Sequence, residues 1–347
     1  MKEDRLLKKA FDDIANKYKW KNAKFYLKSD TSDTYAMTSE HLLCRCLYLD
    51  EAGKNREETL FIKREIKKQA SIYFYLKFYE NEVEFYKWTC SHKVPIEIPK
   101  CYYAECDSNN QEMIIVMNKY DEYKIINQVE GISKNELIKI VQQICNFHNY
   151  YFKEKNVFSC RELPDDIVNF YKDDFENSYK VCLSEFFEFL PNNLSQLYNK
   201  IIQNFELIFM KINHGPQSLI HFDLRLDNFL FYSDNSVLAL LDWQMVRKGN
   251  VTWDLVILVI GNLNELSIEN VKEILMNYYS MSFLKDKYTY DQFIEDFKYA
   301  LIYQIIREIC YLGDDSYKIE ARILYASKVT VRYSSIFEKL IDLKLFE

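Results

Sequence analysis

The chain contains few of the residues that interrupt regular structure: its 347 residues include only 6 glycines and 5 prolines. Flexible linkers are usually rich in glycine, serine or proline. The sequence shows no such stretch, no internal repeat and no low-complexity segment. At this length we therefore expect one large bilobal unit, or two domains of ordinary size, without a disordered connector.

Positive charge is scarce relative to negative charge. The chain has 45 lysines and arginines against 52 acidic residues, which gives a formal net charge of −7. A nucleic-acid surface needs clustered Lys and Arg that outweigh the acids. We therefore expect no nucleic-acid partner, and we interpret lysine pairs such as Lys67 and Lys68 as solvated faces.

Long apolar runs and paired cysteines are missing as well. The run from Leu255 to Ile260 is far shorter than the ~20 residues that span a bilayer. The nine cysteines are odd in number and scattered, without a disulfide framework or a CxxC zinc pattern. Glu3 and Asp4 disfavour a targeting helix at the N-terminus. We therefore expect no membrane partner and a cytoplasmic location, while the oligomeric state is left open.

Hydrophobic periodicity predicts strands first and helices later. A helix is expected near the N-terminus, followed by a second helix over about 64–88. Residues beyond about 132 have mostly helical periodicity, apart from a strand-like island at 218–243. The strands expected before residue 120 are 24–28, 42–49, 59–63, 101–105 and 113–117.

This order of elements predicts an α+β fold of two lobes. The first lobe, residues 1–120, would be an antiparallel sheet with a helix packed on it and would end in a hinge. The second, residues 121–347, would be mainly helical and would contain the strand-like island.

The most informative stretch reads HFDLRLDN at 221–228, followed by LLDWQ at 240–244. Asp223 and Asn228 stand five positions apart on an expected loop, and Asp242 ends an apolar strand. Amide and carboxylate oxygens are the ligands that Mg²⁺ prefers. Phosphoryl transfer depends on positioning and on neutralising the charge of the phosphate oxygens. We therefore interpret Asp223 as the catalytic base, and Asn228 and Asp242 as ligands of one Mg²⁺.

Two neighbours of Asp223 belong to the same candidate catalytic loop. Arg225 would contact the transferring phosphoryl group as a guanidinium clamp. The ring of His221 would bond to the backbone and hold the loop instead of carrying a proton. The competing interpretation is that Asp and Asn in a turn only cap the local backbone, which is their usual role.

These two segments resemble the signature of the aminoglycoside phosphotransferase and choline kinase superfamily. The DWQ form, with Gly249 and Asp254 downstream, is most similar to the ecdysteroid kinase-like branch. The resemblance implies a protein-kinase-like fold with a sheet lobe, a hinge and a helical lobe that binds the acceptor. It also implies that the chain uses ATP and Mg²⁺ to phosphorylate a hydroxyl group of a small molecule.

The resemblance extends to residues outside the two segments. Lys63 would hold the α- and β-phosphates and Glu82 would be its helix partner, with Glu84 as a weaker alternative. Asp254 would brace the catalytic loop. The remaining nucleotide contacts implied are a hinge at Asn118, Lys119 and Tyr120, and hydroxyl groups of Ser29, Thr31 and Ser32 in the phosphate turn.

The sequence also departs from the family pattern. Phe222 stands where the family has glycine, so a close backbone approach there is in doubt. No GxGxxG segment covers the phosphates, and Asp30 and Asp33 in the turn at 29–35 would repel a triphosphate unless they point away.

These departures keep a pseudokinase or nucleotide-binding module open as an alternative. A protein kinase is the second alternative, because HFDLRLDN also resembles HRDLKPEN, although no APE-like segment follows the loop. The acceptor is not identified. Five aromatic side chains would either line its pocket or fill the helical core: Trp253, Tyr278, Tyr279, Tyr303 and Tyr311.

Overall fold

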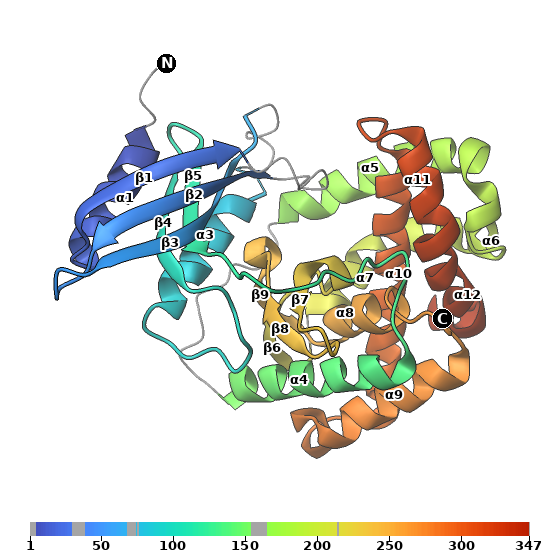
Figure 1. Ribbon diagram of the computed structural model, residues 1–347. Helices are drawn as coiled ribbons and strands as arrows, with labels where there is room; N and C mark the ends of the chain where they lie inside the picture. Colours follow the sequence, from blue (N-terminus) through green and yellow to red (C-terminus); the bar gives the residue numbers. More distant parts are fainter. Residues whose placement is uncertain are drawn as a thin grey trace. The chain divides into compact units, whose positions relative to one another are not determined.

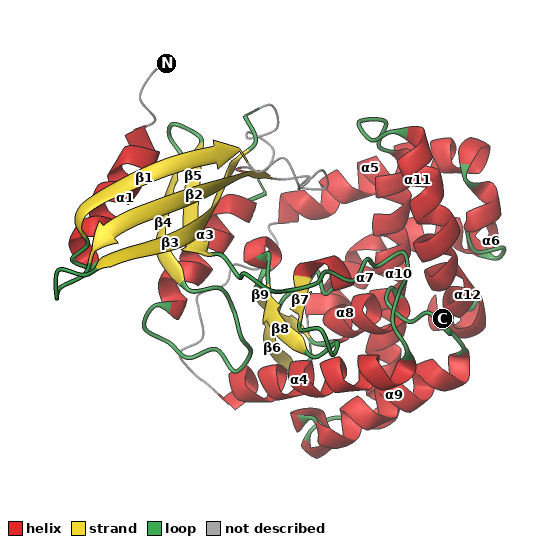
Figure 2. Cartoon of the chain, viewed as in Figure 1, coloured by secondary structure: helices red, strands yellow, loops and turns green. Residues whose placement is uncertain are grey.

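The computed structural model describes residues 5–29, 39–67, 74, 76–153, 165–213 and 215–346. The chain divides into two compact units, Met1–Tyr123 with Ala239–Val246, and Lys124–Leu238 with Arg247–Glu347. Long strands gather in the first unit and helices in the second (Figure 2). The expected α+β class is therefore confirmed. The sequence assigned 239–246 to the helical part, whereas the structure groups this segment with the sheet.

The first unit is built on a five-stranded antiparallel sheet (Figure 1). Every expected strand is present and longer than predicted. The strands are β1 (Lys21–Ser29), β2 (Ser39–Leu49), β3 (Asn55–Glu65), β4 (Cys101–Asp107) and β5 (Glu112–Asn118). Their order is β1-β2-β3-β5-β4, so β1 and β4 form the two edges of the sheet.

Side-chain alternation along β3 decides which residues face each helix of this unit. Leu60 and Ile62 share a hydrophobic core with α1 (Arg5–Lys17). Since successive side chains point to opposite faces of a sheet, Lys63 faces the other helix, α3 (Phe78–Thr89).

The prediction that a helix starts near residue 64 is wrong. Arg64 continues the ladder of β3 by pairing with Ile114 of β5. The next residue, Glu65, accepts a hydrogen bond from the Met113 backbone N–H at 2.8 Å. These β contacts outweigh the helical periodicity of the local sequence.

The segment Ala239–Val246 joins the first unit through its backbone and one large ring. The Leu240 N–H donates to the Glu97 carbonyl oxygen at 2.9 Å. Trp243, in the short helix η3 (Trp243–Met245), stacks on Phe85 of α3 with ring centroids 4.1 Å apart. Asp242 is thereby fixed in the sheet unit.

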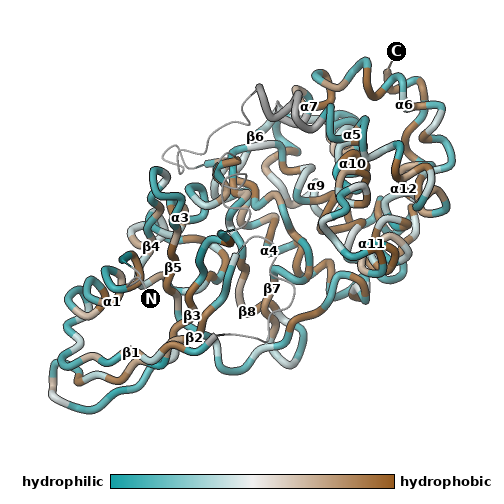
Figure 3. Tube along the Cα trace, turned by 90° about the horizontal axis from the view of Figure 1, so that it is seen from above, coloured by the Kyte–Doolittle hydropathy of each residue, from teal (hydrophilic) through white to brown (hydrophobic). Residues whose placement is uncertain are grey.

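The second unit packs its helices around α10 (Tyr290–Gly313), which is buried along most of its length. Hydrophobic and hydrophilic residues alternate along these helices (Figure 3). None of the helices within the described ranges has the length and apolar character needed to cross a bilayer. The other helices are α4 (Lys134–Lys153), α5 (Asp165–Glu185), α6 (Leu194–Gln203), α7 (Phe205–Asn213), α8 (Thr252–Leu255), α9 (Ile268–Met281), α11 (Ile319–Tyr325) and α12 (Val331–Leu340).

Four short strands frame the loop that carries the HFDLRLDN sequence. The loop follows β6 (Gln217–Ile220), ends in the one-turn helix η2 (Leu226–Asn228), and leads into β7 (Phe229–Phe231). β7 pairs with β8 (Val237–Leu240), and β6 pairs with β9 (Arg247–Asn250). The sequence did not predict β9, because Arg-Lys-Gly-Asn has no strand periodicity. Gly249 packs closely there, since a Cβ would lie 2.7 Å from the end of the Ile220 side chain, which would have to shift.

Candidate active site

In the first unit, Lys63 lies between two carboxylates. Its Nζ is 2.8 Å and 2.9 Å from the two oxygens of Glu82 and 2.6 Å from Oδ1 of Asp242. Lys63 and Glu82 are buried, whereas the Asp242 side chain keeps 20% of its exposure. The expected pairing of Lys63 with Glu82 is therefore present, and Asp242 completes a triad.

This triad carries one positive and two negative charges. Burial alone would lower the pKa of Lys63, but the charges of Asp242 and Glu82 raise it above its ordinary value. Burial raises the pKa of Glu82, an effect that Lys63 opposes and Asp242 reinforces. An ammonium shared by two carboxylates leaves a local excess of negative charge, which favours binding of a further cation.

In the second unit, Asp223 is bound by Arg225 and Asn228. The Nε and Nη2 atoms of Arg225 donate to the Asp223 carboxylate at 3.1–3.2 Å. The Asn228 amide nitrogen donates to the Asp223 backbone oxygen at 2.8 Å and to its Oδ2 at 3.1 Å. The loop therefore brings together the three residues that the sequence assigned to chemistry there.

The electrostatics of this loop keep Asp223 ionised. Burial alone would raise the pKa of Asp223, but the guanidinium groups of Arg225 and Arg307 lower it below its ordinary value. Asp223 in turn raises the pKa of Arg225. The result is a buried carboxylate with a fixed charge, the state required to accept a hydrogen bond from a hydroxyl group.

Asp254 holds the start of the loop. Its Oδ2 accepts the His221 backbone N–H at 2.9 Å and its Oδ1 accepts the Phe222 N–H at 2.6 Å. The His221 ring accepts the Asp223 N–H through Nδ1 at 3.3 Å. Asp254 and the His221 ring therefore both contact the backbone of the loop, and the part that either plays in a reaction stays a prediction.

Phe222 adopts a backbone conformation that normally favours glycine, with φ at 71°. Its ring is buried against Trp253, with centroids 4.1 Å apart. The guanidinium carbon of Arg247 lies 4.2 Å from the ring centroid. The departure from the family glycine therefore leaves the left-handed turn in place, because packing of the ring offsets its backbone strain.

The sequence analysis missed three residues that support this loop. The Asn262 amide accepts the Leu226 N–H at 3.2 Å and donates to the Leu224 carbonyl oxygen at 2.9 Å. His148 contacts Asp254 through Nε2 at 3.1 Å, and Arg307 affects Asp223 by its charge. Asn262 could have been noticed as a polar residue at the end of an apolar run. His148 could have been noticed as a lone histidine on the apolar face of a helix.

The chain matches the model of the ecdysteroid kinase-like family over residues 36–288. The chain belongs to this family. The resemblance seen in the sequence is thereby confirmed. No curated protein sequence matches the chain significantly.

Solved structures similar to this ecdysteroid kinase-like chain are small-molecule phosphotransferases. The GDP complex of aminoglycoside 2'-phosphotransferase-IIIa has a TM-score of 0.56 at 12% identity, covering 96% of this chain and 100% of that one. Choline kinase LicA from Streptococcus pneumoniae has a TM-score of 0.52 at 12% identity, with 96% and 100% covered. LicA in complex with AMP gives 0.53 at 11%, with 98% and 96% covered. These similarities show a shared kinase-like fold.

The residues expected at the hinge are partly engaged within the sheet unit of this family member. The Asn118 N–H donates to the Lys100 carbonyl oxygen at 3.0 Å, and the Lys119 N–H donates to the Thr59 carbonyl oxygen at 3.3 Å. These two N–H groups are therefore not the donors that an adenine edge would use. Tyr120 follows them and is half-buried.

The expected phosphate turn lies mostly outside the described residues. This applies to Thr31 and Ser32, and also to Asp30 and Asp33. Ser29 is the last residue of β1, and its side chain is not among those described. The role of this turn stays a prediction.

The five aromatic residues considered for the acceptor pocket separate by burial. Trp253, Tyr278 and Tyr303 are buried and belong to the core. Tyr279 is half-buried, and its hydroxyl donates to the Tyr288 carbonyl oxygen at 2.6 Å. Tyr311 is also half-buried.

Tyr311 is part of a cluster of tyrosines beside the loop. Its ring centroid lies 5.0 Å from that of Tyr317 and 4.9 Å from that of Tyr325. All three rings are within electrostatic reach of Arg225. These three tyrosines form an aromatic cluster around Arg225.

The oxygen donors of Asn228 and Asp242 suit a hard cation. The Asn228 amide uses its nitrogen for both of its hydrogen bonds to Asp223, which leaves the carbonyl oxygen for a metal. Asp242 uses Oδ1 for Lys63 and accepts the Gln244 amide through Oδ2 at 3.2 Å. In the described part of the chain no cluster of three His, Cys, Asp or Glu side chains could hold a metal.

Proposed function

We propose that this chain transfers the γ-phosphoryl group of ATP, with Mg²⁺, to a hydroxyl group of a small molecule. The observation that carries the proposal is the state of Asp223, a buried carboxylate kept ionised by Arg225 and bound by the Asn228 amide. Membership of the ecdysteroid kinase-like family supports the same reaction class.

Asp223 would orient the acceptor hydroxyl and accept its proton. Its low pKa makes it a weak base, which is sufficient because phosphoryl transfer is catalysed mainly by positioning and by stabilisation of charge. Arg225 would hold the carboxylate in place and present its guanidinium to the transferring group. His221 and Asp254 act on the reaction only through the backbone of the loop.

Lys63, oriented by Glu82, would bind the α- and β-phosphates. Asn228, through its amide oxygen, and Asp242 would hold Mg²⁺, which when bound neutralises charge on the β- and γ-phosphates. The hydroxyl groups of Ser29, Thr31 and Ser32 are proposed to meet the phosphates from the turn after β1. The AMP complex of LicA and the GDP complex of the 2'-phosphotransferase support a nucleotide as cofactor.

The acceptor would enter beside Arg225, where Tyr311, Tyr317 and Tyr325 offer flat surfaces with hydroxyl groups. Tyr325 is fixed by donating its hydroxyl to Glu308 at 3.2 Å. A hydroxylated body that stacks on these rings would be held without a large number of charged contacts.

ADP release tests the proposal directly. Purified protein with Mg-ATP is screened against hydroxylated alcohols, amines and sterols, and the active acceptor is then used with Asp223→Asn. We expect turnover with at least one acceptor and its loss, by about 10³-fold or more, in the variant. Asp234→Asn is the matched control, because Asp234 is exposed in a turn of the same unit.

Two results would count against the proposal. Unchanged turnover in Asp223→Asn would reject the role of that residue. Stabilisation of the protein by Mg-ATP in a thermal-shift assay, with no turnover across the whole library, would instead favour a nucleotide-binding module without catalysis.

A further inference from the structure

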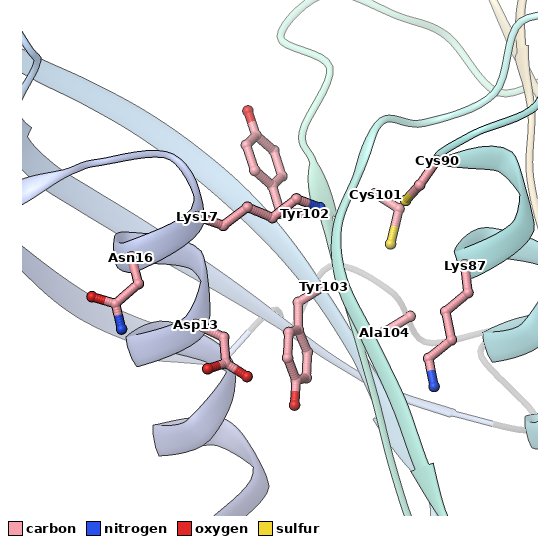
Figure 4. Close-up of a pocket in the computed structure, with 9 residues that line it drawn as sticks. All are labelled: Asp13, Asn16, Lys17, Lys87, Cys90, Cys101, Tyr102, Tyr103 and Ala104. Carbon is pink, nitrogen blue, oxygen red and sulfur yellow. The ribbon is translucent and has the colours of Figure 1, made fainter.

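The first unit contains a cavity of about 500 Å³ away from the Lys63 triad. It lies along the edge strand β4, beside the C-terminal ends of α1 and α3 (Figure 4). Two lysines line it, Lys17 from α1 and Lys87 from α3, against one acid, Asp13. Two cysteines, Cys90 and Cys101, also line it.

The two cysteines come from different elements and contact one another. Cys90 follows the last residue of α3 and is exposed, whereas Cys101 is the first residue of β4 and is buried. Their side chains lie together on one side of the cavity (Figure 4), and each thiol shifts the pKa of the other. Both cysteines are free thiols.

The environment of Cys90 favours a reactive thiolate. The hydrogen bond from Cys101 lowers the pKa of Cys90 to about 6; burial opposes this shift and the charge of Lys17 assists it. When it is protonated, the Cys90 thiol donates to the Tyr86 carbonyl oxygen at 3.4 Å, which favours the thiol over the thiolate. The same hydrogen bond, together with burial, raises the pKa of Cys101. One thiol of the pair is thus suited to attack and the other to remain protonated.

We propose that Cys90 and Cys101 form a thiol–disulfide exchange site for a small disulfide that carries carboxylates, of which oxidised glutathione is the probe. The cavity gives such a molecule access to the exposed thiol of Cys90. Lys17 and Lys87 give the lining a net positive charge that matches the carboxylates.

The exchange proceeds in two balanced steps. The Cys90 thiolate attacks one sulfur of oxidised glutathione, which forms a mixed disulfide and releases one glutathione thiolate. The Cys101 sulfur then attacks the Cys90 sulfur, the second glutathione leaves, and the Cys101 proton passes to it. Two protein thiols are oxidised to one disulfide while one small disulfide is reduced to two thiols. The new bond ties the end of α3, the helix that carries Glu82, to the edge of the sheet.

Peptide mapping of the full chain tests this site. Wild-type protein is treated with oxidised glutathione near neutral pH, free thiols are blocked, and the disulfides are located by mass spectrometry. We expect a Cys90–Cys101 disulfide to form, and Cys90 to be alkylated by iodoacetamide with a midpoint near pH 6. Alkylation of Cys90 no faster than that of Cys106 would overturn the proposal. Cys106 is the internal control, because it lies on β4 together with Cys101 and burial raises its pKa to about 12.

A pair of variants separates the two roles of Cys101. Cys101→Ser keeps a hydroxyl donor but no resolving sulfur, so the glutathione adduct on Cys90 should persist while its formation stays fast. Cys101→Ala also removes the donor, so the alkylation midpoint should rise. If instead Cys101→Ser showed no adduct at Cys90, or an adduct that disappears as fast as in the wild type, the site would be refuted. Equal exchange rates for oxidised glutathione and uncharged 2-hydroxyethyl disulfide would overturn the preference for an acidic disulfide.

Discussion

Replacing Phe222 by alanine and by glycine separates backbone strain from side-chain packing in the catalytic loop. Phe222 has φ at 71°, and its N–H is held by the Asp254 carboxylate at 2.6 Å. Its ring is buried against Trp253 and lies under the Arg247 guanidinium. Both substitutions remove the ring, whereas only glycine also removes the steric penalty of the left-handed turn.

The expected magnitudes follow from these contacts. Loss of a buried phenylalanine ring costs about 3–5 kcal/mol, and Phe222→Ala should lose roughly this amount. Glycine regains about 1–2 kcal/mol of strain. Glycine also loses about 0.4–1 kcal/mol through the greater freedom of its unfolded chain. Phe222→Gly should therefore be less stable than the wild type but more stable than Phe222→Ala by roughly 1 kcal/mol.

Urea unfolding followed by tryptophan fluorescence measures this difference. Trp253 packs against Phe222, so the signal includes a probe at the altered position. An alanine variant as stable as the glycine variant, or more stable, would show that strain at Phe222 does not set this difference. That result would mean that the loop relaxes out of the left-handed conformation once the ring is absent.

Two further predictions concern the groups around the catalytic elements. Lys63→Met should cost about 3–5 kcal/mol at neutral pH because it leaves Glu82 buried without its cation. The pKa of Glu82 is already raised in the folded protein, and removing Lys63 should raise it further. The loss in free energy of unfolding should therefore shrink as the pH falls towards the pKa of Glu82 in the unfolded chain, about 4.3. A pH-independent loss in urea unfolding would contradict this. Asp254→Asn should lower kcat about 10–100-fold while the Kd for Mg-ATP stays within about twofold, since the loop shifts but no nucleotide contact is removed. Calorimetry showing mainly weakened nucleotide binding would argue against a positioning role.

Local patterns predicted the parts of the fold in which neighbours in sequence are also neighbours in space. The five strands follow from alternation of apolar residues, and the contacts of Asp223 with Arg225 and Asn228 follow from a spacing of a few residues. The pairing of Lys63 with Glu82 came from the family resemblance and not from a local pattern, and the structure shows this contact.

Long-range contacts were not predictable from single positions. Arg307 lies near the C-terminal end of α10, and nothing in its local sequence connects it to Asp223. Asn262 and His148 look like isolated polar residues until the chain brings them to Leu226 and Asp254. The start of α3 was misplaced for the same reason, because the ladder between β3 and β5 decides where the strand ends.

Calorimetry in a double-mutant cycle of Asn228→Ala and Asp242→Ala, with and without Mg²⁺, measures whether these two residues hold the same ion when ATP binds. If both residues hold the same ion, either substitution alone should remove most of the Mg²⁺-dependent binding free energy. The double variant should then bind Mg-ATP about as weakly as the weaker single variant, while binding in EDTA is the same for all four proteins. If the losses in binding free energy of the two single variants simply add in the double variant, Asn228 and Asp242 do not hold the same ion.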